Sequence, residues 1–249
     1  MIELAEQDGV AVLRLAHGKV NAMSMEFCEA LTARFAEISS ARAVVMTATG
    51  RTFSAGVDLV RLLEGGAPYV RKFLPVLSEM FATVFSHPAP VVAAINGHAV
   101  AGGCILALTA DYRILRRGGV QVGLNEVKVG VPLPWSVALL LRASVPAAAL
   151  TQVALLGRNF ADDDAIAVGL ADQLADADGF EDFCLARLGE FADKDAASVA
   201  VTKGYLRQGV LREMRAREAA EIPVWLDRWF SEPTRERIRR TVATITKTR

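Results

Sequence analysis

The sequence predicts an α/β protein, and three apolar patterns carry that prediction. Residues 2–6 and 10–15 form two short apolar runs around the turn Asp8-Gly9, which is typical of a β-hairpin. The β-branched runs 43–47 and 90–95 each precede a glycine-containing turn, and apolar residues at helical spacing follow. We therefore expect two strands and then an alternation of strands and helices.

The next elements follow from the same periodicities. Ser24 is expected to cap a helix whose apolar residues recur at helical spacing, namely Phe27, Leu31, Phe35 and Ile38. A second helix is expected over about 68–85, and a third from near Gly102. Short strands are expected at 112–115 and 120–122.

The C-terminal part of the chain is predicted to be helical. The pattern is mostly helical from Pro134, and no strand is expected after about Lys194. Trp225, Trp229 and Phe230 share one helical face, and a basic helix follows them. We expect these aromatics to dock on a partner subunit, because a short helical layer cannot bury them alone; packing on their own domain is the alternative.

Length and composition limit the protein class. The chain has 249 residues, of which 52% are hydrophobic and 22% charged, and its formal net charge is zero. One main domain over 1–193 and a helical region over 194–249 are expected. The neutral charge argues against nucleic acid or an acidic membrane as the main partner. The sequence shows no signal-peptide pattern and no apolar run near the roughly 20 residues of a membrane span, so we expect a cytoplasmic protein.

Several kinds of chemistry are disfavoured by residue type and spacing. The histidines His17, His87 and His98 show no paired spacing with one another or with cysteines, so no metal site is expected. The three cysteines lie in apolar helical patterns and are expected to be buried, reduced thiols: Cys28, Cys104 and Cys184. The glycine pattern matches neither a nucleophile elbow nor a dinucleotide or phosphate loop.

Two glycine-containing turns are the strongest functional signal. The turn at 96–103 joins a buried strand to a helix, and N–H groups at a helix start lack partners within the helix. The turn at 52–58 follows another buried strand and is expected to aim a second N–H at the same point. Paired N–H donors of this kind stabilise an enolate or a tetrahedral intermediate.

Glu126 is the candidate acid–base residue. It lies in an apolar, glycine-bounded segment, 121–132, where burial would raise its pKa and make it a proton acceptor near neutral pH. A surface ion pair with Lys128 is the more common role for such a carboxylate. From the residues alone, both interpretations stay open.

Four motifs resemble the crotonase (enoyl-CoA hydratase/isomerase) superfamily. They are Phe53-Ser-Ala-Gly-Val-Asp-Leu59, Ala94-Ile-Asn-Gly97, Ala101-Gly-Gly-Cys104 and Asp111-Tyr-Arg-Ile114, and the match covers nearly the whole chain. The resemblance implies a crotonase (ClpP-like) spiral of ββα units over 1–193 that holds an acyl-CoA site. It also implies a helical trimerisation region over 194–249, a homotrimer or hexamer, and an acyl-CoA thioester substrate. Coenzyme A is then part of the substrate, and no separate cofactor is expected.

The same resemblance assigns roles to single residues. The backbone N–H groups of Val57 and Gly102 are expected to form the oxyanion hole, with Glu126 as the base. Asp58 is expected to brace the oxyanion turn by bonding backbone amides. Six residues are expected to contact the acyl-CoA: Ala22, Ala55, Gly56, Asp58, Leu59 and Leu124.

The expected reaction depends on a second carboxylate. Hydratases of this superfamily carry one glutamate three residues after the second oxyanion glycine and another in a Gly-x-x-Glu segment; here these positions hold Ile105 and Glu126. A single base suits double-bond migration, so the pattern resembles the Δ3,Δ2-enoyl-CoA isomerases of fatty-acid metabolism. Helical spacing predicts that Ile105 faces the substrate carbons. The alternatives are an enoyl-CoA hydratase and a non-catalytic acyl-CoA-binding protein, the latter favoured if Glu126 faces solvent or is ion-paired outside the acyl channel.

Overall fold

The larger of two sheets forms the body of the protein. The computed structural model describes residues 1–7 and 9–247, so Asp8 of the predicted hairpin turn lies outside the described residues. The sheet has the order β1-β2-β3-β5-β7-β10; β1 pairs antiparallel with β2, and all other neighbours are parallel. Its strands are β1 (Ile2–Gln7), β2 (Val10–Leu15), β3 (Ala43–Ala48), β5 (Val91–Ile95), β7 (Tyr112–Arg116) and β10 (Gln173–Ala175).

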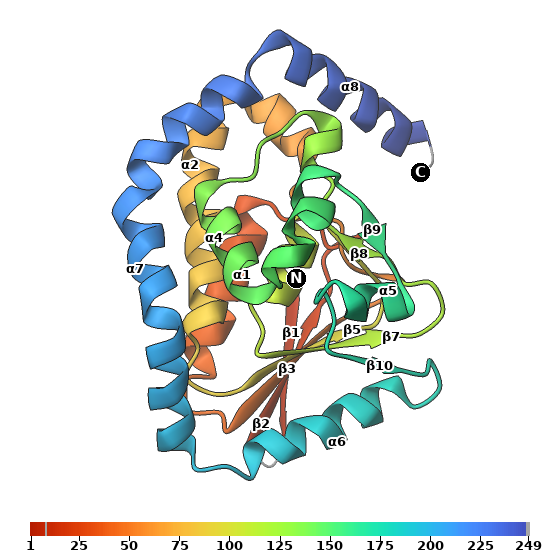
Figure 1. Ribbon diagram of the computed structural model, residues 1–249, viewed down its shortest axis with the longest axis vertical. Coiled ribbons are helices and arrows are strands. Elements are labelled where there is room, and N and C mark those ends of the chain that lie inside the picture. The colour runs from red at the N-terminus through yellow and green to blue at the C-terminus, as the bar shows by residue number, and fades with distance from the viewer. Residues whose placement is uncertain (8, 248–249) are drawn as a thin grey trace.

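Both faces of this sheet are covered, which explains the continuous apolar runs of its central strands. Val44 and Met46 of β3 point into the main core, whereas Ala43 and Val45 point to the opposite face. The opposite face is covered by α6 (Phe180–Ala192), which lies below the sheet in Figure 1. The main core contains α1 (Met25–Glu37), α2 (Leu59–Ser86) and α3 (Gly102–Leu108).

A smaller sheet carries the two functional turns. It has the order β4-β6-β8-β9, from β4 (Thr52–Ser54), β6 (His98–Val100), β8 (Val122–Gly123) and β9 (Asn159–Phe160). β4 pairs parallel with β6, so the turns that follow these two strands leave the sheet at the same edge. The strand predicted at 120–122 is shorter in the structure, where it is β8 (Val122–Gly123).

The first two helices show where local signals suffice and where they do not. Ser24 caps α1 by accepting a hydrogen bond from the Phe27 N–H at 3.3 Å, as predicted. Helix α2 begins at Leu59, where Asp58 caps it, and the predicted helix over about 68–85 is the part of α2 that follows Gly66. Gly66, with φ of +59°, breaks the helical geometry within α2, and this break conceals the first turns from a periodicity argument.

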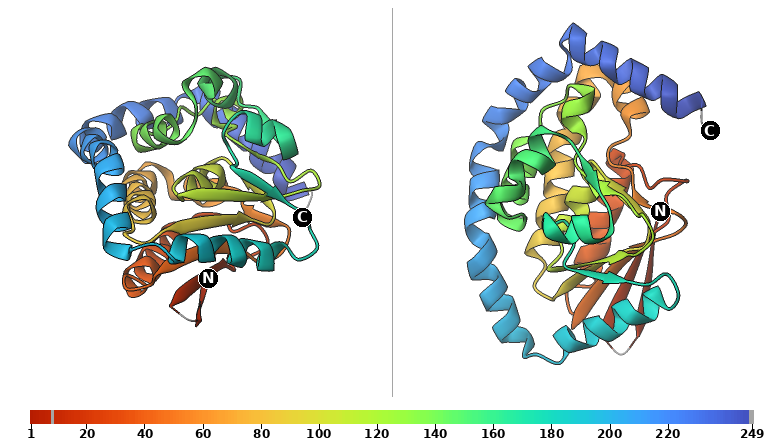
Figure 2. Two further views of the ribbon diagram at one scale, coloured as in Figure 1. Left: turned by 60° about the horizontal axis from the view of Figure 1, so that its bottom comes forward. Right: turned by 45° about the vertical axis from the view of Figure 1, so that its right-hand side comes forward.

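Smaller elements lead to the long C-terminal helices. They are the 3₁₀ turn η1 (Glu126–Val129), α4 (Trp135–Ser144), the short turns η2 (Ala147–Ala149) and η3 (Thr151–Leu155), and α5 (Asp162–Ala167). Helix α7 (Ala196–Trp229) then runs along the whole molecule, and α8 (Glu232–Lys247) crosses one end, as both figures show (Figures 1 and 2). The predicted boundary at 193/194 falls in the turn between α6 and α7.

Helix α7 is fixed to the main domain by buried charges. Lys203 Nζ lies 2.6 Å from Asp111 Oδ2 and donates to the Ala89 carbonyl at 2.9 Å. Arg207 lies 2.7 Å from the other carboxylate oxygen of Asp111, and this carboxylate also accepts from the Val91 N–H. One aspartate thereby holds two cations of α7 against the start of β5 and β7.

The terminal aromatics pack on their own chain, which corrects the expected docking on a partner. Trp225 is 8% exposed and Trp229 is 1% exposed, and their rings stack with centroids 4.9 Å apart. They lie against α2 and α4, because α7 turns back over the main domain instead of standing free. Phe230 is partly buried against the same core.

The cysteine prediction is confirmed, since Cys28, Cys104 and Cys184 are all free and buried. Within residues 1–7 and 9–247, no helix combines the length and apolar character needed to cross a bilayer. The same residues contain no cluster of three potential metal ligands.

Candidate active site

The two predicted turns meet, and glycine at two positions allows the contact. A Cβ added to Gly56, whose φ is +84°, would lie 2.8 Å from the Gly102 nitrogen. A Cβ added to Gly102 would lie 3.6 Å from the Val57 nitrogen. Ala101 has φ of +52° and ψ of −129°, a costly conformation for alanine that the turn imposes just before α3. The backbone nitrogens of Val57 and Gly102 therefore border the same small space.

Both of these N–H groups are unpaired among the described residues. Gly102 is the first residue of α3, so its N–H has no partner within the helix. In the bridge between Met23 and Val57, the donors are Met23 N, to the Gly56 carbonyl at 2.8 Å, and Asp58 N, to the Met23 carbonyl at 3.0 Å. Val57 N–H takes no part in the bridge and is left available for an oxyanion.

A buried polar network holds the first turn in place. Ser54 Oγ donates to the Asn21 carbonyl at 2.8 Å and accepts from the Gly56 N–H at 3.2 Å. The Asn21 side-chain amide in turn donates to the carbonyls of Thr52 and Phe53. Because both side chains are paired with backbone groups, the turn is fixed before any substrate binds.

Next to these N–H groups lies a cavity of about 220 Å³ with an apolar wall. Its lining comes from the two turns, from α2, from the segment after β8, from α4 and from the C-terminal helices. The lining residues are Ala55, Val57, Leu59, Leu62, Phe73, Leu74, Leu77, Phe81, Val100, Ala101, Gly102, Asn125, Glu126, Val129, Val131, Pro134, Val137, Trp225, Trp229 and Thr241. Of these, Glu126 alone carries a titratable side chain.

Glu126 is a partly exposed residue whose carboxyl group has one buried, unpaired oxygen among the described residues. It is the first residue of η1, and its Oε2 is buried and has no hydrogen-bond partner among the described residues. Burial raises the pKa of this carboxyl from 4.5 to about 7, and hydrogen bonds from its own N–H and that of Asn125 offset part of the effect. The ion pairs found in the described chain do not include one between Glu126 and Lys128. The site thus offers a base near neutral pH beside two oxyanion donors, which suits proton transfer next to a thioester carbonyl.

The predicted site residues divide into two groups. Val57, Gly102, Glu126, Ala55 and Leu59 line the cavity. The other four do not line it: Ala22, Gly56, Asp58 and Leu124. Asp58 Oδ1 accepts from the Arg61 N–H at 3.0 Å, so it bonds a backbone amide of α2 and not one of the oxyanion turn.

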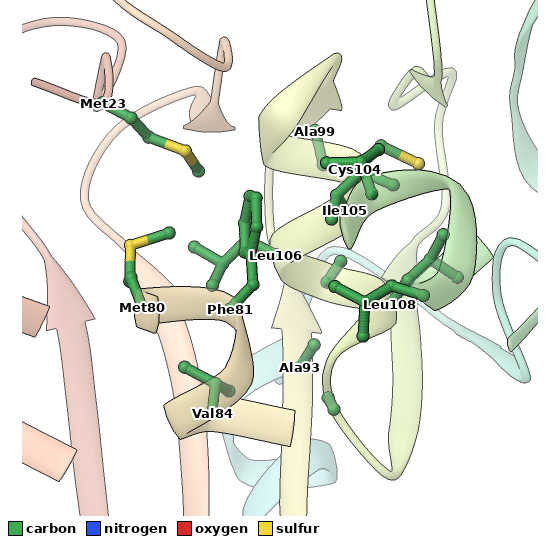
Figure 3. Close-up of a cluster of buried hydrophobic side chains, with 14 of the residues drawn as sticks. Met23, Met80, Phe81, Val84, Ala93, Ala99, Cys104, Ile105, Leu106 and Leu108 are labelled. Carbon is green, nitrogen blue, oxygen red and sulfur yellow. The ribbon is translucent and has the colours of Figure 1, made fainter. Parts of the chain in front are cut away.

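The expected orientation of Ile105 is wrong. It is fully buried and does not line the cavity. Figure 3 shows it in the packed cluster beside Cys104 and Ala99. The side chain of Ile105 packs among other core residues, although Gly102, one turn earlier on α3, borders the cavity.

Most of the cavity wall was not identified from the sequence. Phe73, Leu77 and Phe81 repeat at helical spacing on α2, but a core helix shows the same pattern. Trp225, Trp229 and Thr241 come from a region distant in sequence, and only the position of α7 and α8 brings them to the site.

Comparison with known proteins agrees with this fold and site. The enoyl-CoA hydratase/isomerase family profile matches residues 5–236, and the chain belongs to that family, the crotonase superfamily. Human mitochondrial enoyl-CoA delta isomerase 1 is 27% identical over 219 residues, 86% of this chain and 72% of that protein. A putative enoyl-CoA hydratase of Thermus thermophilus is 36% identical over 168 residues, 66% of each chain.

Two solved structures have a similar fold. A structure of human mitochondrial delta3-delta2-enoyl-CoA isomerase superposes with a TM-score of 0.95 over 100% of this chain and 99% of that one, at 23% identity. A probable enoyl-CoA hydratase from Mycobacterium tuberculosis H37Rv superposes with a TM-score of 0.85 over 92% and 99% of the two chains, at 29% identity. The architecture, a mixed α/β body with a helical C-terminal region, is the crotonase fold.

Proposed function

We propose that this chain is a Δ3,Δ2-enoyl-CoA isomerase of fatty-acid metabolism. The observation that carries the proposal is that the cavity lining contains one carboxyl group, Glu126, beside the free N–H groups of Val57 and Gly102. Moving a double bond needs a base that takes a proton from C2 and returns it at C4. One carboxyl group suffices for both transfers.

In the proposed reaction, the thioester oxygen of a 3-enoyl-CoA accepts hydrogen bonds from the N–H groups of Val57 and Gly102. The ionised Glu126 removes a proton from C2, and negative charge develops on the thioester oxygen as the dienolate forms. Protonated Glu126 then delivers that proton to C4, which gives the 2-enoyl-CoA and restores the carboxylate. Atoms balance without any separate cofactor, since coenzyme A is part of the substrate.

Two alternatives make different demands on the same cavity. An enoyl-CoA hydratase is favoured by the hydratase names among relatives, including the Thermus thermophilus protein. It would need a second group to hold the water, and among the described lining residues the polar side chains besides Glu126 are Asn125, Thr241 and the two tryptophans. A binding-only protein would be favoured by a solvent-facing or ion-paired Glu126, whereas its Oε2 is buried and unpaired within the described chain.

The test is to incubate the purified protein with a 3-enoyl-CoA and, separately, with a 2-enoyl-CoA. We expect double-bond migration with the first and little hydration of the second. Glu126→Gln should lower migration by about 10²-fold or more, the range for a positioned general base, while acyl-CoA binding is retained. Glu218→Gln is the matched control, because Glu218 is another glutamate whose pKa burial raises but which does not line the cavity. Equal migration by wild type and Glu126→Gln would refute the proposal.

We also propose that the protein acts as a homotrimer or as a dimer of trimers. Support comes from the family resemblance and from large apolar side chains that α7 leaves exposed, with Tyr205 73% and Leu206 78% exposed.

A further inference from the structure

The acyl cavity shares a wall with a second, smaller hollow. The second hollow holds about 20 Å³, roughly the space of one water molecule. Four residues line both spaces and so separate them: Leu74, Leu77, Pro134 and Trp225. Trp225 is the largest side chain of this partition. The far side is polar as well as apolar, since Ser136, Glu218 and Glu221 line it.

Trp225 is held firmly in the partition. Its Nε1–H donates to the Pro132 carbonyl at 2.7 Å, which ties α7 to the segment that follows η1. Its ring stacks on Trp229, with centroids 4.9 Å apart and an interplanar angle of 19°. A side chain fixed by a hydrogen bond and by a stacked neighbour does not swing aside at low cost, so the wall has a definite position.

We propose that Trp225 sets the maximum acyl chain length by closing the acyl cavity on the side of the second hollow; this rests on the proposed acyl-CoA function. The thioester is fixed at Val57 and Gly102, so the acyl chain must run along the apolar wall of the same cavity. A chain longer than the cavity meets the indole of Trp225. Beyond the indole, the carboxyl groups of Glu218 and Glu221 oppose further apolar extension.

The test measures kcat/KM for a series of 3-enoyl-CoA substrates of increasing length, from hexenoyl to hexadecenoyl. Each methylene that gains burial should raise kcat/KM about fourfold, equal to ~0.8 kcal/mol, until the chain reaches the partition. We call the chain length at which this rise in kcat/KM stops the break. Trp225→Leu should move the break to longer chains by one or two methylenes. Trp135→Leu is the matched control, because Trp135 lines only the second hollow, and its break should stay at the wild-type length. A break at the same length in wild type and Trp225→Leu would overturn the proposal.

A second variant and a binding measurement separate the effect on chain length from a failure to fold and from a loss of activity. If Trp225→Leu does not fold, Leu77→Ala opens the partition from the α2 side and should also move the break to longer chains. Dissociation constants of saturated acyl-CoA thioesters should show the same break in each variant. If acyl-CoA binding shows the predicted break but no double bond migrates, the proposed isomerase activity is refuted and the proposed role of Trp225 in limiting chain length is supported. Migration with no shift of the break in either variant would refute the partition alone.

Discussion

Glu126→Gln should stabilise the fold at high pH while it abolishes activity. In the unfolded chain this carboxyl ionises near 4.5, whereas burial raises its pKa to about 7 in the folded protein. Below 4.5 the group is protonated in both states. Between about pH 4.5 and about pH 7 the unfolded chain gives up this proton while the folded chain keeps it, so stability falls as the pH rises across that window. Above about 7 the carboxyl is ionised in both states, and the loss is complete. At about 1.4 kcal/mol per pKa unit, the loss amounts to about 3 kcal/mol at high pH.

The amide that replaces the carboxyl group in this variant cannot ionise, so the variant escapes that loss. The assay is urea unfolding of wild type and Glu126→Gln at one fixed protein concentration, at about pH 4 and about pH 9. The free-energy difference between the two proteins should move in favour of the variant by about 3 kcal/mol between these pH values. Taking the difference cancels the other titrating groups, which the two proteins share. A difference that does not change with pH would refute the burial of an unpaired carboxyl at this position.

Four more outcomes are expected. The kcat/KM for double-bond migration should fall as the pH drops below about 7, because the base must be ionised, and a flat profile across that pH would contradict the role of Glu126. Gly56→Ala should lower kcat about 10²-fold, because its Cβ would strike the Gly102 nitrogen, whereas Gly50→Ala, at a similar positive φ but with open space around it, should leave kcat unchanged. Asp111→Ala should cost about 3 kcal/mol in urea unfolding, since the buried Lys203 and the partly buried Arg207 of α7 lose their shared carboxylate; a cost below about 1 kcal/mol would show that α7 is held by other contacts. Light scattering should report a trimer or hexamer at micromolar concentration, and a stable monomer would contradict the proposed assembly.

Local signals predicted the elements that position the chemistry. The caps and periodicities of α1, the apolar runs of β3 and β5, and the helix start at Gly102 depend on a few adjacent residues, and the structure has each of them. The meeting of the two glycine turns was also predictable, because the two strands predicted before them, β3 and β5, are parallel neighbours whose ends lie at the same edge of the sheet. Short strands such as β6 and β10 were missed, since three residues carry too little periodicity.

The parts that were wrong depend on long-range packing. The direction of Ile105 follows from how α3 sits in the core, which helical spacing to Gly102 does not determine. The tryptophans of α7 were assigned to a partner because nothing in the local sequence reveals that the helix returns across α2 and α4. Apolar pattern specifies that a face is buried, but not which surface buries it.

Helices α7 and α8 complete the cavity wall, and they are the last elements to be synthesised. Ribosomes release the two turns, Glu126 and the α2 wall well before Trp225, Trp229 and Thr241. Until those last residues emerge, the apolar side of the cavity stays uncovered, and an exposed apolar surface on a nascent chain favours aggregation. We therefore expect chains that end before α7 and α8 to aggregate or to need chaperones, although all three catalytic groups have been made by then.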